Sequence, residues 1–263
     1  MSSLSTRFIR QLKSEMTMVR TDRAGHTVLL VGLVVSVMWG VFLAYLTIVY
    51  QDEATTPSPR VPAGGLAQLG YCALMVWAVI LLLGSKAKGF WNMRVLVEPA
   101  RWIVSLATLV HLTVWSAVFA VLAVLVSMPV GAAVVGVMGY DSSSLLGSFG
   151  EVLTVLVQMV GFALGVTWFA AGWALICNSI GNALAVVLVW PFLLEGMLPD
   201  EGIAATLREF MPFINGLAWY QGNEALQLPW PAPIGLVYFL VITLAFALVG
   251  VWVRRHETLL LNS

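Results

Sequence analysis

The sequence predicts an all-α, polytopic membrane protein with six transmembrane helices, and three observations predict it. First, 60% of the 263 residues are hydrophobic and only 10% are charged, whereas a soluble domain is roughly half apolar and a quarter charged. Second, apolar runs longer than about 18 residues recur along the chain, as bilayer-spanning helices require. Third, Lys and Arg are concentrated in alternate connecting segments, which is typical of a chain that crosses a membrane repeatedly.

Residues 1–26 are expected to form a cytoplasmic amphipathic helix that lies on the membrane surface. Leu4, Phe8, Leu12 and Met16 recur every four residues, and most of the basic side chains fall off this stripe. This arrangement is typical of helices that bury an apolar face at the lipid boundary. The helix could be a lipid anchor, a docking site for a partner, or both.

Residues 27–263 are expected to form one transmembrane domain. Its six spans are predicted at about 27–50, 66–84, 102–128, 152–176, 183–198 and 234–253. The end of the third span near Met128 is blurred by Pro129 and the Gly/Ala/Val stretch after it, and Pro191 interrupts the fifth. Gly161 and Gly165, four residues apart in the fourth span, would let a neighbouring helix approach closely.

The segment between the last two spans, 199–233, contains apolar pieces that are too short to cross a bilayer. Pro199, Pro212, Gly216 and Pro229 punctuate them. Such pieces suit short re-entrant or interfacial helices. An ordinary loop anchored by aromatic residues is the alternative.

The orientation follows from the basic residues. All of the Lys and Arg residues except Arg60 and Arg208 lie in the N-terminal segment, in the loop after the second span or near the C-terminus. Because cytoplasmic segments carry the excess of Lys and Arg, both termini are expected in the cytoplasm of a multi-pass plasma (inner) membrane protein.

The loop that follows the second span combines charges with two adjacent aromatic residues, which a plain connector does not need. The residues of interest are Lys86, Lys88, Phe90, Trp91, Arg94 and Glu98. Aromatic residues and arginine are enriched at protein interfaces, so this loop is a candidate docking helix. Trp91 could equally belong to the interfacial aromatic belt.

Enzyme motifs are absent from the sequence. There is no phosphate-binding G-x-x-x-x-G-K-[ST] loop and no H-E-x-x-H motif, and the stretch from Leu146 to Gly150 lacks the first glycine of a G-x-S-x-G elbow. The histidines His26, His111 and His256 are too scattered to suggest a metal site. We therefore predict no catalytic residue, no metal and no cofactor in this chain. The net charge of zero and the lack of a basic tract argue against a nucleic-acid partner.

The predicted spans contain almost no ionisable residues, and only His111 and Glu195 are candidates. A proton- or sodium-driven carrier usually places carboxylates along its path. The energy for any transport is therefore expected to come from another protein. Gln158, together with Trp168, Trp173 and Asn178 at the inner end, gives the fourth span a polar and aromatic face. This face could contact a substrate or hold neighbouring helices together.

Taken together, these features resemble the membrane-spanning (permease) subunit of ABC-2 type ATP-binding cassette exporters. The shared features are the basic amphipathic N-terminal helix, the basic and aromatic inner loop, the short turn between spans four and five, the broken segment after span five, and a last span that ends in Arg254-Arg255-His256-Glu257. The resemblance covers the whole chain and rests on architecture rather than on a strict motif.

The resemblance implies a pathway between two permease subunits, as a homo- or heterodimer, in the lipid bilayer. Two cytoplasmic ATPase subunits, which bind ATP and Mg, would drive it by alternating access. Docking would involve Phe8, Leu12 and Arg20 of the first helix together with Lys86, Lys88, Phe90, Trp91, Arg94 and Glu98 of the inner loop. Members of the family export drugs, peptides, lipids or polysaccharides, and nothing in the sequence selects among these hydrophobic or amphipathic substrates.

The candidate pathway residues are Tyr71, Trp77, Gln158, Trp168, Trp190 and Glu195. Spans two and five line the dimer interface in the family, which is why Tyr71, Trp77 and Trp190 are included. Two other classes of function stay open: a membrane-embedded immunity, binding or assembly protein that does not transport, and a lipid-modifying membrane enzyme.

Overall fold

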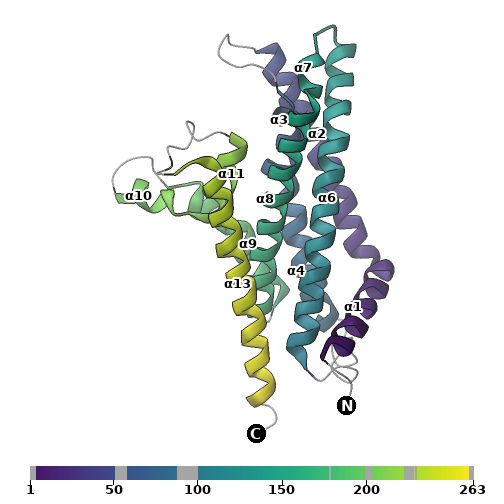
Figure 1. Ribbon diagram of the computed structural model, residues 1–263, viewed down its shortest axis with the longest axis vertical. Coiled ribbons are helices and arrows are strands. Elements are labelled where there is room, and N and C mark those ends of the chain that lie inside the picture. Colours follow the sequence, from purple (N-terminus) through teal and green to yellow (C-terminus); the bar gives the residue numbers. More distant parts are fainter. Residues whose placement is uncertain are drawn as a thin grey trace.

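The computed structural model describes residues 4–50, 58–87, 100–177, 179–198, 203–221, 228 and 230–260, and every regular element within these ranges is helical (Figure 1). The prediction of an all-α fold is confirmed for this part of the chain. The helices are α1 (Leu4–Thr21), α2 (Arg23–Val49), α3 (Arg60–Gly65), η1 (Leu66–Gly70), α4 (Tyr71–Ala87), α6 (Arg101–Val137), α7 (Ser143–Leu146), α8 (Phe149–Ile176), α9 (Ile180–Val189), η2 (Trp190–Glu195), α10 (Ile203–Glu209), α11 (Pro212–Gln221) and α13 (Ala232–Leu260), of which η1 and η2 have the wider turns of a π-helix.

Five helical stretches of the described chain are long and apolar enough to cross a membrane. They are Arg23–Val49, Arg60–Gly84, Trp102–Val137, Phe149–Ile176 and Ala232–Arg255. The predicted fifth span is not among them, because the apolar helix there, Ile180–Glu195, is shorter. With 10 residues in α9 and 6 in η2, this stretch reaches only about 24 Å at about 1.5 Å per residue, against a hydrocarbon core of about 30 Å.

The start of α1 and the end of α13 lie at the same end of the bundle (Figure 1). We call this end the terminal end, and the opposite end, where α3 and α7 lie, the distal end. The chain crosses between them along α2, then α3 with α4, then α6, α8 and α13. Between Ile176 and Ala232 the described part of the chain forms the shorter helices α9, η2, α10 and α11.

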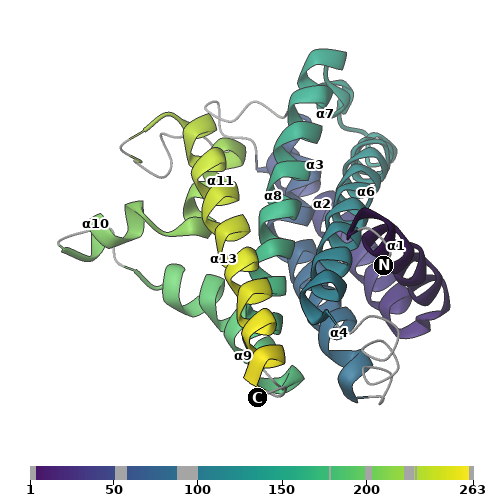
Figure 2. The same cartoon turned by 60° about the horizontal axis from the view of Figure 1, so that its bottom comes forward.

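The centre of the bundle is α8, which packs against α4, α6 and α13, and Figure 2 shows it between α13 and α6. Gly161 and Gly165 face α13. The side chain of Leu236 fills the space beside Gly161, and the ring of Phe239 lies directly over Gly165. The close helix approach predicted from this glycine pair is therefore present.

A second close contact joins α2 to the segment formed by α3 and η1. A methyl group added to Gly40 would overlap the carbonyl oxygen of Pro62, and one added to Gly65 would overlap the carbonyl oxygen of Ser36. Backbone meets backbone at both points, so glycine is needed on each helix. Small residues of this kind permit the close packing on which helix association in membranes depends.

The third span does not end at Pro129. Instead α6 continues through the proline to Val137. Proline removes one hydrogen-bond donor from a helix, but in a bilayer every other backbone group still needs an internal partner, so a continued helix costs less than an irregular end. The second crossing likewise begins earlier than predicted, at Arg60, because Pro62 lies in the first turn of α3, where proline is tolerated.

The first turn of α8 is fixed by a reciprocal cap. The backbone N–H and the hydroxyl of Ser148 donate to Oε2 of Glu151 at 2.6 and 2.9 Å, and the Glu151 N–H donates back to the Ser148 hydroxyl. This capping box satisfies amide groups that would otherwise lack partners. Gly147, just before the cap, has a φ of 60°, a conformation that favours glycine. Ser148 therefore has a structural role here.

Candidate functional site

The candidate site is built around the carboxylate of Glu195, at the end of η2. This side chain is only 2% exposed. One oxygen accepts the indole N–H of Trp190 at 2.7 Å, and the other accepts the backbone N–H groups of Phe213 and Ile214 at 2.9 and 3.0 Å. These amides lie in the first turn of α11, where a helix presents unpaired N–H groups and a partial positive charge. Glu195 therefore joins η2 to the start of α11.

Aromatic rings from five elements gather beside this carboxylate. Tyr71, the first residue of α4, lies 5.8 Å from Phe192 of η2 and 5.9 Å from Phe162 of α8 between ring centroids. Phe169 of α8 contacts Phe213 at 5.1 Å. We define the aromatic cluster as Tyr71, Phe162, Phe169, Trp173, Trp190, Phe192, Phe213, Phe239 and Phe246, which are linked by ring contacts throughout. The structure thus brings together three predicted pathway residues: Tyr71, Trp190 and Glu195.

One polar group in the aromatic cluster has no hydrogen-bond partner. The indole Nε1 of Trp173 is buried and makes no hydrogen bond within the described residues. A buried donor without a partner costs roughly 1 to 3 kcal/mol, so it is a natural position for an acceptor on a bound molecule. The rings themselves belong to the hydrophobic core of the described bundle, and Tyr71, Phe162, Phe169, Phe213 and Phe239 are at most 6% exposed.

The other predicted pathway residues lie elsewhere. The indole N–H of Trp168 donates to the Thr113 hydroxyl at 2.9 Å, which joins α8 to α6. Of the two roles left open by the sequence, this contact fits the one in which Trp168 holds neighbouring helices together. Gln158, earlier on α8, is buried. Within the described residues, no ring contact joins Trp168 to the aromatic cluster.

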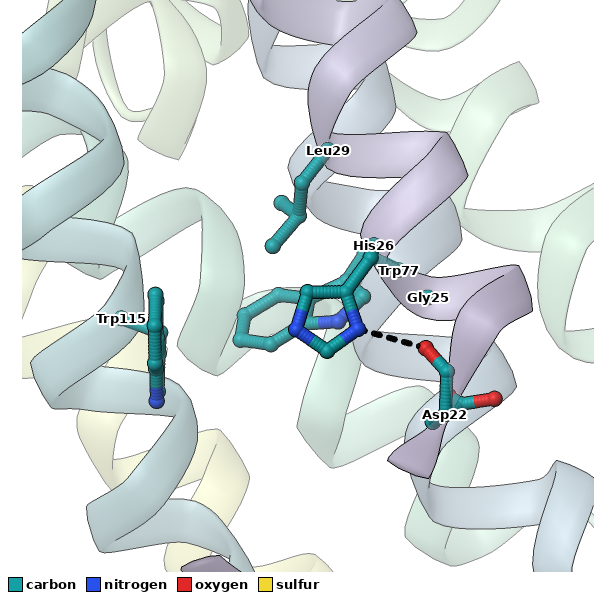
Figure 3. Close-up of a pocket in the computed structure, with 6 residues that line it drawn as sticks. All are labelled: Asp22, Gly25, His26, Leu29, Trp77 and Trp115. Atoms are coloured by element: carbon teal, nitrogen blue, oxygen red, sulfur yellow. Dashed lines mark hydrogen bonds between the residues drawn. The ribbon is translucent and has the colours of Figure 1, made fainter. Parts of the chain in front are cut away.

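Trp77 of α4 lines a separate small cavity beside the junction of α1 and α2. Figure 3 shows Asp22, Gly25, His26, Leu29, Trp77 and Trp115 around it. Nδ1 of His26 lies 2.7 Å from the carbonyl oxygen of Asp22, so this nitrogen carries the proton and donates. Asp22 has a non-helical backbone that separates α1 from α2. The cavity lies at this break between α1 and α2, and the buried Trp77 is part of its wall.

The predicted docking residues are described only in part. Phe8 and Leu12 of α1 are half-buried, whereas Gln11 and Glu15 are the most buried of the described side chains of this helix and form a 2.8 Å hydrogen bond. Because α1 packs on α6, this polar pair belongs to the packed side, and Leu4, Ile9 and Met16 are exposed. Arg20 and Lys86 fall in the last turns of α1 and α4, and Lys88, Phe90, Trp91, Arg94 and Glu98 lie outside the described residues.

Sequence reasoning missed several residues of the site. Phe169 and Phe213 sit at the centre of the aromatic cluster, and Asn215, which is fully buried, accepts the indole N–H of Trp230 at 2.8 Å and donates to the carbonyl of Glu209 at 2.7 Å. An asparagine within an otherwise apolar short helix was a usable signal. A phenylalanine within an apolar span could not be singled out, because the sequence does not distinguish a ring that faces the core from one that faces lipid.

The residues present do not suggest a metal centre. No group of three or more His, Cys, Asp and Glu side chains comes together within the described residues. His111 is buried on α6 beside Trp115, at 6.2 Å between ring centroids.

Comparison with known proteins finds no matching protein-family model and no matching curated protein. The function must therefore be argued from the chain itself.

Proposed function

We propose that this chain is the membrane-spanning subunit of an ATP-binding cassette exporter that moves a hydrophobic or amphipathic molecule, such as a drug, peptide, lipid or glycan, across the plasma membrane. The observation that carries the proposal is the aromatic cluster, which five elements build beside a segment too short to cross the bilayer. Rings of this kind suit a substrate that is mainly apolar. A separate subunit would bind and hydrolyse ATP with Mg, since the chain has no phosphate-binding loop.

We further propose six crossings, with α9 and η2 as part of the fifth. Since α8 ends at the terminal end and α13 runs back to the same end (Figure 1), the chain must return toward the distal end between Ile176 and Ala232. Helices α9 and η2 are too short for this alone, so α10 and α11 would complete the crossing as re-entrant helices. Irregular backbone at membrane depth needs protein around it, and Glu195 provides partners for the start of α11.

The terminal end is proposed to face the cytoplasm. It carries α1, the end of α4, the start of α6 and the Arg254-Arg255 pair, which together hold most of the basic residues. Cytoplasmic segments are enriched in Lys and Arg. The exposed apolar residues of α1, Leu4, Ile9 and Met16, would then lie at the inner lipid boundary or against the ATPase subunit. A second permease subunit would complete the pathway.

The first experiment is affinity purification of the intact chain in mild detergent, with identification of the proteins that co-purify and an ATPase assay. We expect an ATPase subunit with a phosphate-binding loop at a fixed stoichiometry, with an activity that requires this chain. A preparation that binds no ATPase and hydrolyses no ATP would contradict the proposal and favour a membrane binding or assembly protein, or a lipid-modifying enzyme.

Variants of the inner loop sharpen this test. Replacing Arg94 and Glu98 with alanine should abolish the dependence of ATPase activity on the membrane subunit while insertion into the membrane is retained. Asp141→Asn combined with Arg208→Gln removes one charge of each sign from segments away from that loop and serves as the matched control. Full coupling in the Arg94 and Glu98 variant would show that this loop does not dock the ATPase.

A further inference from the structure

A cavity of about 570 Å³ opens at the distal end of the bundle, well away from the aromatic cluster. It is lined by Ser58, Pro59, Arg60, Ser148, Gly150, Glu151, Thr154 and Val155, from the start of α3 and the first turns of α8. Its volume falls within the range of small-molecule sites, roughly 300 to 1,000 Å³. The proposed transport pathway makes no use of it.

Two opposite charges line this cavity without neutralising each other directly. The Arg60 side chain is exposed and makes no hydrogen bond or ion pair with any described residue. Its positive charge acts on the carboxylate of Glu151 through space. On Glu151, Oε2 accepts the backbone N–H and the hydroxyl of Ser148, and Oε1 accepts no hydrogen bond from the described residues. One cationic and one anionic position are therefore available in the same cavity.

The first turns of α8 also lead away from this cavity along an apolar surface. Phe149, Leu153 and Val157 recur every four residues and are exposed, whereas Gly150, Glu151 and Thr154 between them line the cavity. Residues four apart share one face of a helix. A charged recess is thus continuous with an apolar stripe on the same helix, on the surface that a bilayer would cover.

We propose that this cavity binds the headgroup of a zwitterionic phospholipid with a free ammonium group, as in phosphatidylethanolamine. Its phosphate faces the guanidinium of Arg60, its ammonium donates to Oε1 of Glu151, and an acyl chain follows the stripe of Phe149, Leu153 and Val157. Guanidinium groups bind phosphate strongly through charge-assisted hydrogen bonds. The apolar stripe favours a lipid over a soluble zwitterion such as an amino acid. The inference requires only that the chain is embedded in a membrane and not that it transports anything.

The test is native mass spectrometry of the detergent-purified chain with equal amounts of phosphatidylethanolamine, phosphatidylcholine and phosphatidylglycerol. We expect phosphatidylethanolamine to be retained preferentially, because phosphatidylcholine has no N–H to donate and phosphatidylglycerol has no cation. Arg60→Gln should weaken retention of all three lipids by about tenfold, the scale of one charge-assisted contact. Glu151→Gln should abolish the preference for phosphatidylethanolamine.

The Glu151→Gln variant should fold as the wild type does, because glutamine also serves in a capping box. Its melting temperature should therefore not change. Arg208→Gln and Asp141→Asn, which remove charges outside the cavity, should leave lipid retention as in the wild type. Unchanged retention in both cavity variants would overturn the proposal. Competition by soluble glycerophosphoethanolamine as effective as that by the lipid would also overturn it, since the ligand would then be a small zwitterion and the apolar stripe would be irrelevant.

Discussion

At the scale of single residues, Glu195 decides how the short helices are held. A buried carboxylate is expensive unless hydrogen bonds replace its water, and here three N–H groups do so, two of them from the first turn of α11. Pro212 precedes these two amides and has no N–H of its own, which suits the first position of a helix. The same carboxylate therefore satisfies the helix start and orients the Trp190 ring within the aromatic cluster.

Glu195→Ala should lower the thermal stability of the detergent-solubilised protein markedly, because it leaves three buried or half-buried donors without an acceptor. Each such donor costs about 1 to 3 kcal/mol. Glu195→Gln, which retains one acceptor oxygen, should lose less. The check is the melting temperature followed by tryptophan fluorescence, with Glu209→Ala on α10 as a matched control. Equal melting temperatures for Glu195→Ala and the wild type would show that the carboxylate is not needed at the start of α11.

The sequence identified the charged and amphipathic members of the site but not their surroundings. Glu195 could be singled out because a carboxylate in an apolar segment is rare. Trp190 was included only because the resemblance implies that the fifth span lines a dimer interface. Phe169 and Phe213 could not be singled out, since their place in the aromatic cluster depends on how α8 and α11 pack. Trp77 and Trp168 have the same residue type as Trp190 but face other helices.

At the scale of elements, the contact between α2 and α3 depends on residues that lack a side chain. Gly65→Ala would place a methyl group against the carbonyl oxygen of Ser36 and 2.7 Å from the backbone nitrogen of Gly40. Since backbone atoms cannot rotate away, we expect a loss of about 2 to 3 kcal/mol in stability. Gly181→Ala on α9, whose nearest neighbour is 3.8 Å away, should be neutral or slightly stabilising. Melting temperatures in detergent compare the two, and similar values would contradict this account of the contact.

Two adjacent arginines at the end of α13 provide a second test at this scale. Arg254 is 2% exposed and donates to the carbonyl oxygen of Cys177, just after α8, at 3.3 Å, whereas Arg255 is exposed. A cation at a helix C-terminus satisfies its free carbonyl groups and its partial negative charge. Arg254→Ala should therefore destabilise the protein by about 1 to 3 kcal/mol.

Arg255→Ala is the matched control for this contact, with an expected change within about 0.5 kcal/mol. Urea unfolding in mixed micelles, followed by tryptophan fluorescence, measures both variants. If the two substitutions had the same effect, charge at the end of α13 would matter but the contact with α8 would not.

The limits of helix prediction also belong to this scale. The hydrophobicity of the sequence located the long helices, because a long apolar run can be recognised from its composition without knowing its contacts. It placed the end of the third span too early at Pro129, since local propensity favours a break that the bilayer disfavours. It also counted the fifth segment as a crossing, although the predicted stretch 183–198 is no longer than the 16 residues of α9 and η2 together. The wide turn of η2 and the cap on α11 could not be predicted, because both depend on contacts with other helices.

At the scale of the whole molecule, the arrangement predicts that both ends of the chain share one side of the membrane. Single cysteines introduced by Thr6→Cys and Tyr140→Cys, in a background where Cys72 and Cys177 are replaced by serine, report each side to a membrane-impermeant maleimide. Tyr140→Cys should react in intact cells. Thr6→Cys, and likewise Arg255→Cys, should react only after the cells are permeabilised. Opposite behaviour of the Thr6 and Arg255 positions would mean an odd number of crossings.

The wide turn η1 has a consequence for how the chain tolerates changes in length. In an α-helix each residue turns by about 100°, so removing one rotates everything beyond it and exposes the wrong face. At η1 the N–H of Tyr71 reaches the carbonyl of Leu66, five residues back, and this turn holds one residue more than an α-helical turn. Deleting one residue of the turn other than a packed glycine should convert it to an ordinary turn and leave Tyr71 facing the same neighbours. Within the described residues, η1 is therefore the one point of the second crossing at which a residue can be lost without rotating the helix beyond it.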